Sequence, residues 1–137
     1  MDVVVVVDVV VDGTQPIEVA GRQAGMFGFQ RLDVYRCAVE FLGHAAGLAA
    51  RAPRGYAALG DQLRRAALSV TLNIAEGSGK PDRDAKRYYG IARGSALECA
   101  AILDAFAALE FVPPTELPPR IELLERIVSM LSRMARS

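Results

Sequence analysis

Tryptophan is missing from this chain of 137 residues, histidine occurs once and cysteine occurs twice. The two cysteines, Cys37 and Cys99, are too few for a disulfide framework, so we expect reduced, buried thiols in a cytoplasmic protein. The one histidine, His44, has no cysteine or carboxylate at metal-ligand spacing, and we interpret it as a solvated or half-buried helix residue. The sequence therefore predicts neither a metal site nor a cofactor.

An excess of either charge is also missing, because 16 Lys and Arg residues balance 16 Asp and Glu residues. Global charge therefore gives no argument for a nucleic-acid-binding protein. The charges are nevertheless uneven, since residues 51–93 hold 9 basic and 4 acidic side chains, a net charge of +5. This block leaves two interpretations open, an ordinary solvated surface with ion pairs or a contact surface for an anionic partner. The candidate nucleic-acid-binding residues are Arg64, Lys80, Arg83, Lys86, Arg87 and Arg93.

The valine-rich start of the chain, MDVVVVVDVVVDG, has no long apolar run, because Asp2, Asp8 and Asp12 interrupt the valines. Its longest run, Val3–Val7, is too short to span a bilayer, and the segment lacks the basic region of a signal peptide. Valine favours strands, but we find no second strand candidate to pair with this one. We therefore expect residues 1–26 to form a poorly ordered or extended arm and linker, with Met26 as an alternative start.

From Phe29 onward, apolar residues recur at helical spacing. Helices are expected over about residues 30–50, 57–76, 82–109 and 119–135, with Asp82 as the N-cap of the third. Gly77 and Gly79 are interpreted as the stop of the second helix rather than as a phosphate-binding loop. Because the connections are short, the sequence predicts an all-α fold, an antiparallel up-down-up-down four-helix bundle over residues 27–137.

The spacing also predicts which helix faces form the core. In the second helix this face holds Leu59, Leu63, Ala66, Val70 and Ile74. For the first helix we expect Leu32, Tyr35, Val39, Leu42, Ala46 and Ala49. For the third helix we expect a seam of Tyr88, Ile91, Ser95, Glu98, Ile102, Ala105 and Leu109. In the fourth helix Ile121, Leu124, Val128 and Leu131 lie on one side, beside Leu123, Ile127, Met130 and Met134.

A narrow polar stripe on the second helix is the most informative feature of the sequence. Its members follow one another at steps of 3 or 4 residues, and they are Gln62, Arg65, Ser69, Asn73 and Glu76. Apolar residues flank the stripe on both sides, with Leu68 and Leu72 outside the main core arc. A simple solvated face would not have this pattern.

The matching polar residues in the third helix are Ser95 and Glu98. A carboxylate in a helix seam is costly unless it is paired, and Arg65 can hold it bidentately. We therefore predict an interhelical polar network and a mostly dry Arg65–Glu98 pair. The network has three possible roles, which are structural, ligand-binding and catalytic. The catalytic role, with Glu76 or Glu98 as acid or base, lacks a nucleophile–base pair and a metal set.

At these residues the chain resembles the S23, or 23S rRNA intervening-sequence, four-helix-bundle proteins. The family's Gln-x-x-Arg-Ala-x-x-Ser falls on Gln62 to Ser69, and its Asn-Ile-Ala-Glu-Gly falls on Asn73 to Gly77. Its Ile-Ala-x-Gly-Ser-x-x-Glu falls on Ile91 to Glu98. The opening FQRLDVYRCAVEF also looks like the start of the family, so the resemblance covers about residues 27–135.

The resemblance implies a bacterial, non-enzymatic homo-oligomer, because characterised relatives form pentameric barrels of antiparallel bundles. Some relatives are encoded within interrupted rRNA genes. A related branch, the accessory variability determinants of diversity-generating retroelements, works with a reverse transcriptase and nucleic acid. The expected function is thus an assembly or scaffold protein, with a nucleic-acid-binding accessory factor as the alternative. RNA, DNA or a reverse transcriptase is the partner that the alternative implies, and no membrane is expected.

Overall fold

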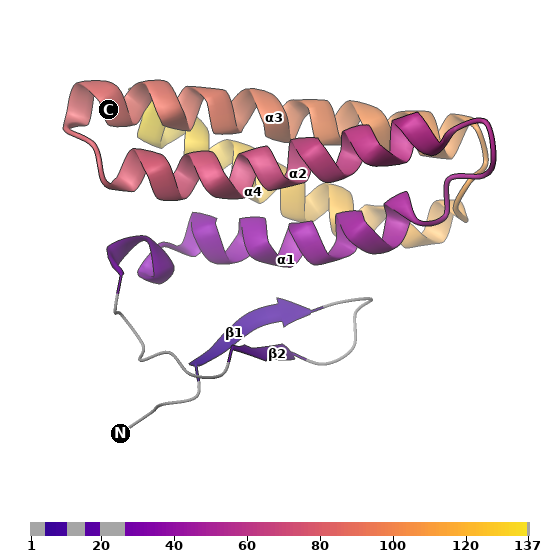
Figure 1. The fold of residues 1–137 in the computed structure, drawn as a ribbon, viewed down its shortest axis with the longest axis horizontal. Coiled ribbons are helices and arrows are strands. Elements are labelled where there is room, and N and C mark those ends of the chain that lie inside the picture. The colour runs from indigo at the N-terminus through magenta and orange to yellow at the C-terminus, as the bar shows by residue number, and fades with distance from the viewer. Residues whose placement is uncertain (1–4, 11–15, 20–26, 137) are drawn as a thin grey trace.

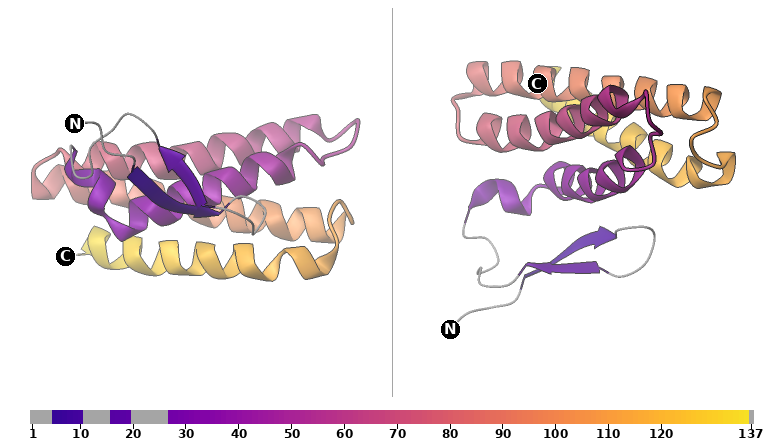
Figure 2. Two further views of the ribbon diagram at one scale, coloured as in Figure 1. Left: turned by 90° about the horizontal axis from the view of Figure 1, so that it is seen from below. Right: turned by 45° about the vertical axis from the view of Figure 1, so that its right-hand side comes forward.

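The protein is described by a computed structural model over residues 5–10, 16–19 and 27–136. Strands β1 (Val5–Val10) and β2 (Pro16–Val19) precede a 3-10 turn, η1 (Gly28–Arg31). The four helices are α1 (Asp33–Ala49), α2 (Ala57–Ser78), α3 (Asp82–Ala108) and α4 (Pro118–Arg136), with the 3-10 turn η2 (Pro114–Glu116) before the last. Figures 1 and 2 show these helices side by side and alternating in direction, which confirms the predicted bundle.

The valine-rich segment is extended, as predicted, but it has a partner strand. β1 and β2 pair antiparallel, with Val5 opposite Val19 and Val7 opposite Ile17, and the register shifts between Val7 and Val10. The expectation that no second strand exists was therefore wrong. Pro16 opens β2, a position where its missing N–H costs little. The alternative start, Met26, and the order of the remaining arm residues lie outside the described part of the chain.

The four helices enclose one core, and every helix contributes to it. The predicted core arcs of α2 and α4 are confirmed, since Leu63, Val70 and Ile74 are buried, as are Leu124, Ile127 and Leu131. The largest fully buried side chains of the other two helices are Phe41, Leu48, Cys99, Leu103 and Phe106. No helix within the described ranges combines the length and apolar character needed to cross a membrane.

The core faces of α1 and α3 are rotated from the predicted ones. The buried residues of α1 are Val34, Cys37, Ala38, Phe41, His44, Ala45, Leu48 and Ala49, so only Ala49 of the predicted set is buried. The buried residues of α3 are Ala85, Ala92, Ala96, Cys99, Ile102, Leu103 and Phe106, so only Ile102 of the predicted seam is buried. Small side chains let α1 and α3 approach their neighbours closely, so the buried positions of these helices include many alanines. The larger residues of the predicted faces lie at the rim of the core.

Two glycines of α2 lie where a neighbouring helix leaves no room for a side chain. A Cβ added at Gly60 of α2 would lie 2.7 Å from the carbonyl oxygen of Ala49 at the end of α1. A Cβ added at Gly77 would lie 2.8 Å from the Tyr89 ring of α3. Of the two glycines predicted to stop α2, Gly79 is its C-cap, whereas Gly77 is buried within the helix, which continues to Ser78. Asp82 is the first residue of α3, and Pro81 takes the N-cap position predicted for it.

Both cysteines are buried and free, in line with the expectation. Burial raises the pKa of the Cys99 thiol to about 12, with a smaller contribution from the charge of Glu98. Burial also raises the pKa of Cys37, although nearby Arg126 acts in the opposite direction. Both thiols therefore stay protonated at neutral pH and pack as small apolar groups. His44 is buried too, deeper than the solvated or half-buried position predicted.

Candidate assembly face and basic end

The polar stripe of α2 meets α3 through a pair of serines. The Ser69 and Ser95 hydroxyls lie 2.8 Å apart and share a hydrogen bond. The Asn73 amide donates to the Ser69 carbonyl oxygen at 2.9 Å and to the Ser69 hydroxyl at 3.1 Å. All three side chains are half-buried. The chain of contacts crosses from α2 to α3 at mid-helix and satisfies these polar groups within the subunit.

A second contact joins the two helices one to two turns away. The Gln62 amide donates to a Glu98 carboxylate oxygen at 3.2 Å, and both residues are exposed. Arg65 is exposed as well, and among the described residues no ion pair joins it to Glu98. The prediction of a mostly dry Arg65–Glu98 pair is therefore wrong for the single chain. Glu98 takes its hydrogen bond from an amide and keeps its charge in solvent.

Glu76, the last residue of the stripe, points to the end of the bundle rather than to Glu98. Its carboxylate forms an ion pair with the Lys80 ammonium at 3.4 Å. Both side chains are substantially exposed, so this pair contributes little to stability. The stripe thus divides into a serine–asparagine cluster, a Gln62–Glu98 contact and an exposed ion pair.

Large apolar side chains lie exposed on both sides of the serine pair. Leu72 is 57% exposed and Leu68 is 44% exposed on α2, while Ile91 is 45% exposed on α3. We call the surface formed by these residues with Arg65, Gly94 and Glu98 the α2/α3 face. It combines exposed apolar groups with two exposed charged residues, Arg65 and Glu98, around a serine pair whose hydrogen bond is already made. An apolar centre with polar groups at its rim is typical of protein interfaces.

The α3 side of this face is unusually flat. Gly90 and Gly94 lie mid-helix on the exposed side, and a Cβ added at either would meet nothing within 4 Å. Glycine inside a helix costs about 1 kcal/mol relative to alanine. Packing within the subunit does not require either glycine, in contrast to Gly60 and Gly77.

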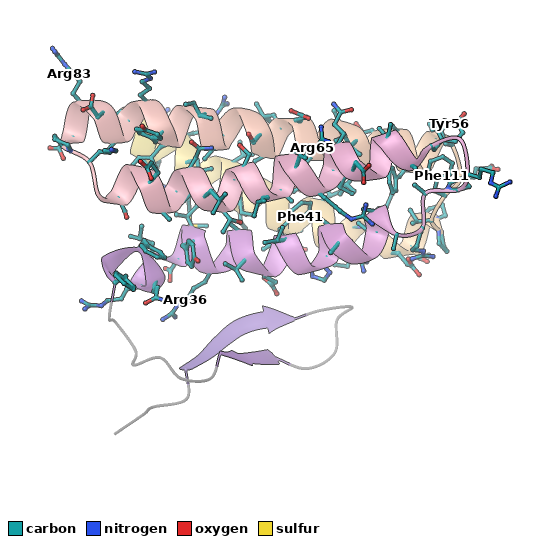
Figure 3. The ribbon with its side chains drawn as sticks, in the orientation of Figure 1. Arg36, Phe41, Tyr56, Arg65, Arg83 and Phe111 are labelled. Carbon is teal, nitrogen blue, oxygen red and sulfur yellow. The ribbon has the colours of Figure 1, made fainter. Side chains whose placement is uncertain are left out.

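The predicted basic residues do not form one patch. Lys80, Arg83, Lys86 and Arg87 lie together around the α2–α3 turn, and Figure 3 shows Arg83 projecting from this end of the bundle. Arg64 lies in the first half of α2, where it pairs with Asp61 at 2.9 Å. Arg93 donates to Ser132 of α4 at 2.7 Å and is half-buried. We call the group around the turn the basic end.

Within the described residues, no group of three or more His, Cys, Asp or Glu side chains could hold a metal ion. The carboxylates of the stripe, Glu76 and Glu98, are separately engaged by Lys80 and Gln62.

Comparison with known families gives one match of high coverage. The family model for the 23S rRNA-intervening sequence protein matches residues 30–133, which is more than half of the chain and includes all four helices almost entirely. The comparison with curated proteins finds no match. The matched range contains the polar stripe, the serine pair and the basic end. On this coverage, the chain belongs to the 23S rRNA-intervening sequence protein family.

Proposed function

We propose that this protein is a non-enzymatic, cytoplasmic assembly protein whose subunits associate through the α2/α3 face. The observation that carries the proposal is the exposure of Leu68, Leu72 and Ile91 around the hydrogen-bonded Ser69–Ser95 pair. Complete burial of one such side chain from full exposure contributes about 1.5–3 kcal/mol. Each of the three is already about half buried, so a second subunit covering them gains roughly half of that per side chain.

The polar groups of the face supply specificity. Ser69, Ser95 and Asn73 satisfy one another within the subunit, so covering them leaves few hydrogen bonds unmade. Arg65 and Glu98 are exposed on the same face, and a neighbouring subunit can bring opposite charges to them. Gly90 and Gly94 allow a neighbouring helix to approach α3 closely. Five subunits is the number that the family resemblance implies.

Leu72→Glu is expected to convert the assembly into single chains. A carboxylate at the centre of an apolar contact loses its hydration without gaining a partner, which is strongly unfavourable. Light scattering should give about 74 kDa for five wild-type chains of 14.7 kDa and about 15 kDa for the variant. The variant should keep the helical circular dichroism of the wild type, because Leu72 contributes little to the core.

Ser129→Glu is the matched control, since Ser129 is an exposed residue of α4 on another side of the bundle. It introduces the same charge and should leave the mass of the assembly unchanged. A wild-type protein of about 15 kDa at micromolar concentration would rule out the proposed assembly. Equal dissociation by both variants would place the contact elsewhere.

A second candidate function is nucleic-acid binding as an accessory factor, acting with RNA, DNA or a reverse transcriptase. The observation that favours it is the clustering of four basic residues at the basic end, where Arg83, Lys86 and Arg87 form no ion pair with any described residue. Phosphate contacts by such side chains are largely independent of sequence and weaken with salt.

Charge reversal at Lys80, Arg83 and Lys86 together is expected to weaken binding of an RNA duplex and to flatten its salt dependence. Each phosphate contact that is lost should reduce the slope of log K against log salt by about 0.9. Filter binding between low and physiological salt measures both quantities. Arg83→Glu alone should weaken binding more than Arg54→Glu, an exposed position at the opposite end. Binding that is absent even at low salt would eliminate this second function.

A further inference from the structure

An aromatic pocket lies beside the start of the helical domain. It has a volume of about 570 Å³, and η1 and the last turns of α2 form its walls. The lining residues that matter here are Phe27, Phe29 and Tyr89. Phe27 is 50% exposed and stacks on Phe29 with the ring centroids 5.8 Å apart and the planes at 13°. An exposed ring held flat by a second ring offers a surface for a further planar group.

The position of Phe27 and Phe29 is fixed from two sides. Phe29 packs edge-on against Tyr35 of α1 at 4.9 Å. The Phe27 backbone N–H donates to the Gln30 side chain at 3.2 Å, and the Gln30 N–H donates back to the Phe27 carbonyl at 3.1 Å. These contacts hold η1 against the bundle, so the aromatic surface is already ordered in the described structure.

A second pocket, of about 340 Å³, adjoins the first at the basic end. It is lined by Lys80, Lys86, Asp82 and Ser78, and the two pockets share Ser78 and Tyr89. Lys86 is half-buried, and no ion pair of the described residues includes it. Lys80 is already paired with Glu76, so Lys86 is the lysine of this pocket that is left to meet an anion.

Tyr89 lines both pockets, and its ring lies against Gly77 of α2. Burial raises the pKa of its phenol, and the charge of Asp82 adds to this effect. The hydroxyl therefore stays protonated at neutral pH and can donate a hydrogen bond to an anion.

We propose that these adjoining pockets bind one unpaired nucleotide, with the base against Phe27 and the phosphate at Lys80 and Lys86. A nucleotide joins a flat base to a negatively charged phosphate. The base suits the aromatic pocket, and the phosphate suits the pocket lined by lysines. Unpaired bases stack on exposed aromatic side chains without sequence preference, whereas a base inside a duplex is already stacked. The proposal deepens the second candidate function by naming the part of the nucleic acid that is recognised. The nucleotide comes either from a free mononucleotide or from a single strand.

The test measures binding of adenosine, AMP, single-stranded hexa-adenylate and a blunt RNA duplex of six base pairs to the full chain, by calorimetry or fluorescence anisotropy. We expect the single strand to bind more tightly than the duplex. Phe27→Ala should weaken single-strand binding about tenfold through lost stacking. Lys86→Gln should weaken AMP and hexa-adenylate and leave adenosine unaffected. The control is Tyr56→Ala, which removes an aromatic ring 43% exposed at the opposite end and should have no effect.

The two sources of the nucleotide separate by affinity. AMP binding as tightly as hexa-adenylate identifies a free nucleotide as the ligand, and much tighter hexa-adenylate binding identifies a strand. Equal affinity for duplex and single strand, with Phe27→Ala indistinguishable from Tyr56→Ala, would overturn the nucleotide site while leaving backbone binding by the basic end intact. An absence of binding to every probe at low salt would overturn both the site and the second candidate function.

Discussion

Replacing Phe106 with alanine is expected to lower the free energy of unfolding by about 3–5 kcal/mol, the range for truncating a buried aromatic residue. Phe106 on α3 is fully buried. Its ring packs edge-on against Phe111 with centroids 5.3 Å apart, and Phe111 packs in the same way against Tyr56 at 4.9 Å. Figure 3 shows Tyr56 and Phe111 together at one end of the bundle. Loss of Phe106 therefore removes core volume and loosens the α3–α4 connection as well.

Urea denaturation followed by circular dichroism measures this loss. The matched control is Phe27→Ala, which deletes the same atoms from a ring that is half exposed at the other end. Its cost should stay within about 1 kcal/mol, as is usual for residues outside the core. Similar midpoints for the two variants would mean that the aromatic cluster around Phe106 is not part of the folded core.

Gly60→Ala is expected to destabilise the bundle by about 1–3 kcal/mol, the usual cost of overpacking. Helix propensity alone predicts the reverse, because alanine in a helix is favoured over glycine by about 1 kcal/mol. Steric contact decides the sign, since the new methyl group would lie 2.7 Å from a backbone oxygen of Ala49. A backbone atom cannot swing away as a flexible side chain can, so α1 and α2 must separate.

Gly94→Ala tests the same substitution where space is open. A Cβ at Gly94 meets nothing within 4 Å, so this variant should gain about 1 kcal/mol from propensity. Thermal melts of both variants are best recorded in the Leu72→Glu chain, where association does not contribute. A stabilising Gly60→Ala would show that the α1–α2 contact is looser than described.

The helices could be predicted from the sequence, whereas two of their buried faces could not. Proline and glycine mark the connections, so the expected ranges agree with the four helices to within a few residues. In α1 and α3 the buried positions include Ala38, Ala45, Ala92 and Ala96, whose small side chains give a weak hydrophobic signal. Larger residues such as Tyr35 and Ile91 gave the stronger pattern but lie at the rim or in solvent.

Part of the candidate site could likewise be predicted from the sequence, and part could not. Helical spacing placed Ser69 and Asn73 on one stripe, and it placed Leu68 and Leu72 outside the core arc, where they are exposed. Helical spacing gives the direction of a side chain around its helix but not its solvent exposure. For this reason the prediction of a mostly dry Arg65–Glu98 pair is wrong, since both residues are exposed. The aromatic pocket could not be predicted, because Phe27 and Tyr89 are 62 positions apart and line one pocket only in the folded chain. The pairing of β1 with β2 was missed because β2 has only 4 residues and begins with proline.

The contact between Gly77 and Tyr89 has a consequence for how related sequences vary. A Cβ at position 77 would lie 2.8 Å from the Tyr89 ring and 3.0 Å from the Tyr88 Cβ, so a larger residue at position 77 forces these side chains to shift. A smaller side chain at position 89 relieves the closer of the two contacts. The two positions should therefore change together during the divergence of homologues, even though α2 and α3 reach them from opposite sides of a turn.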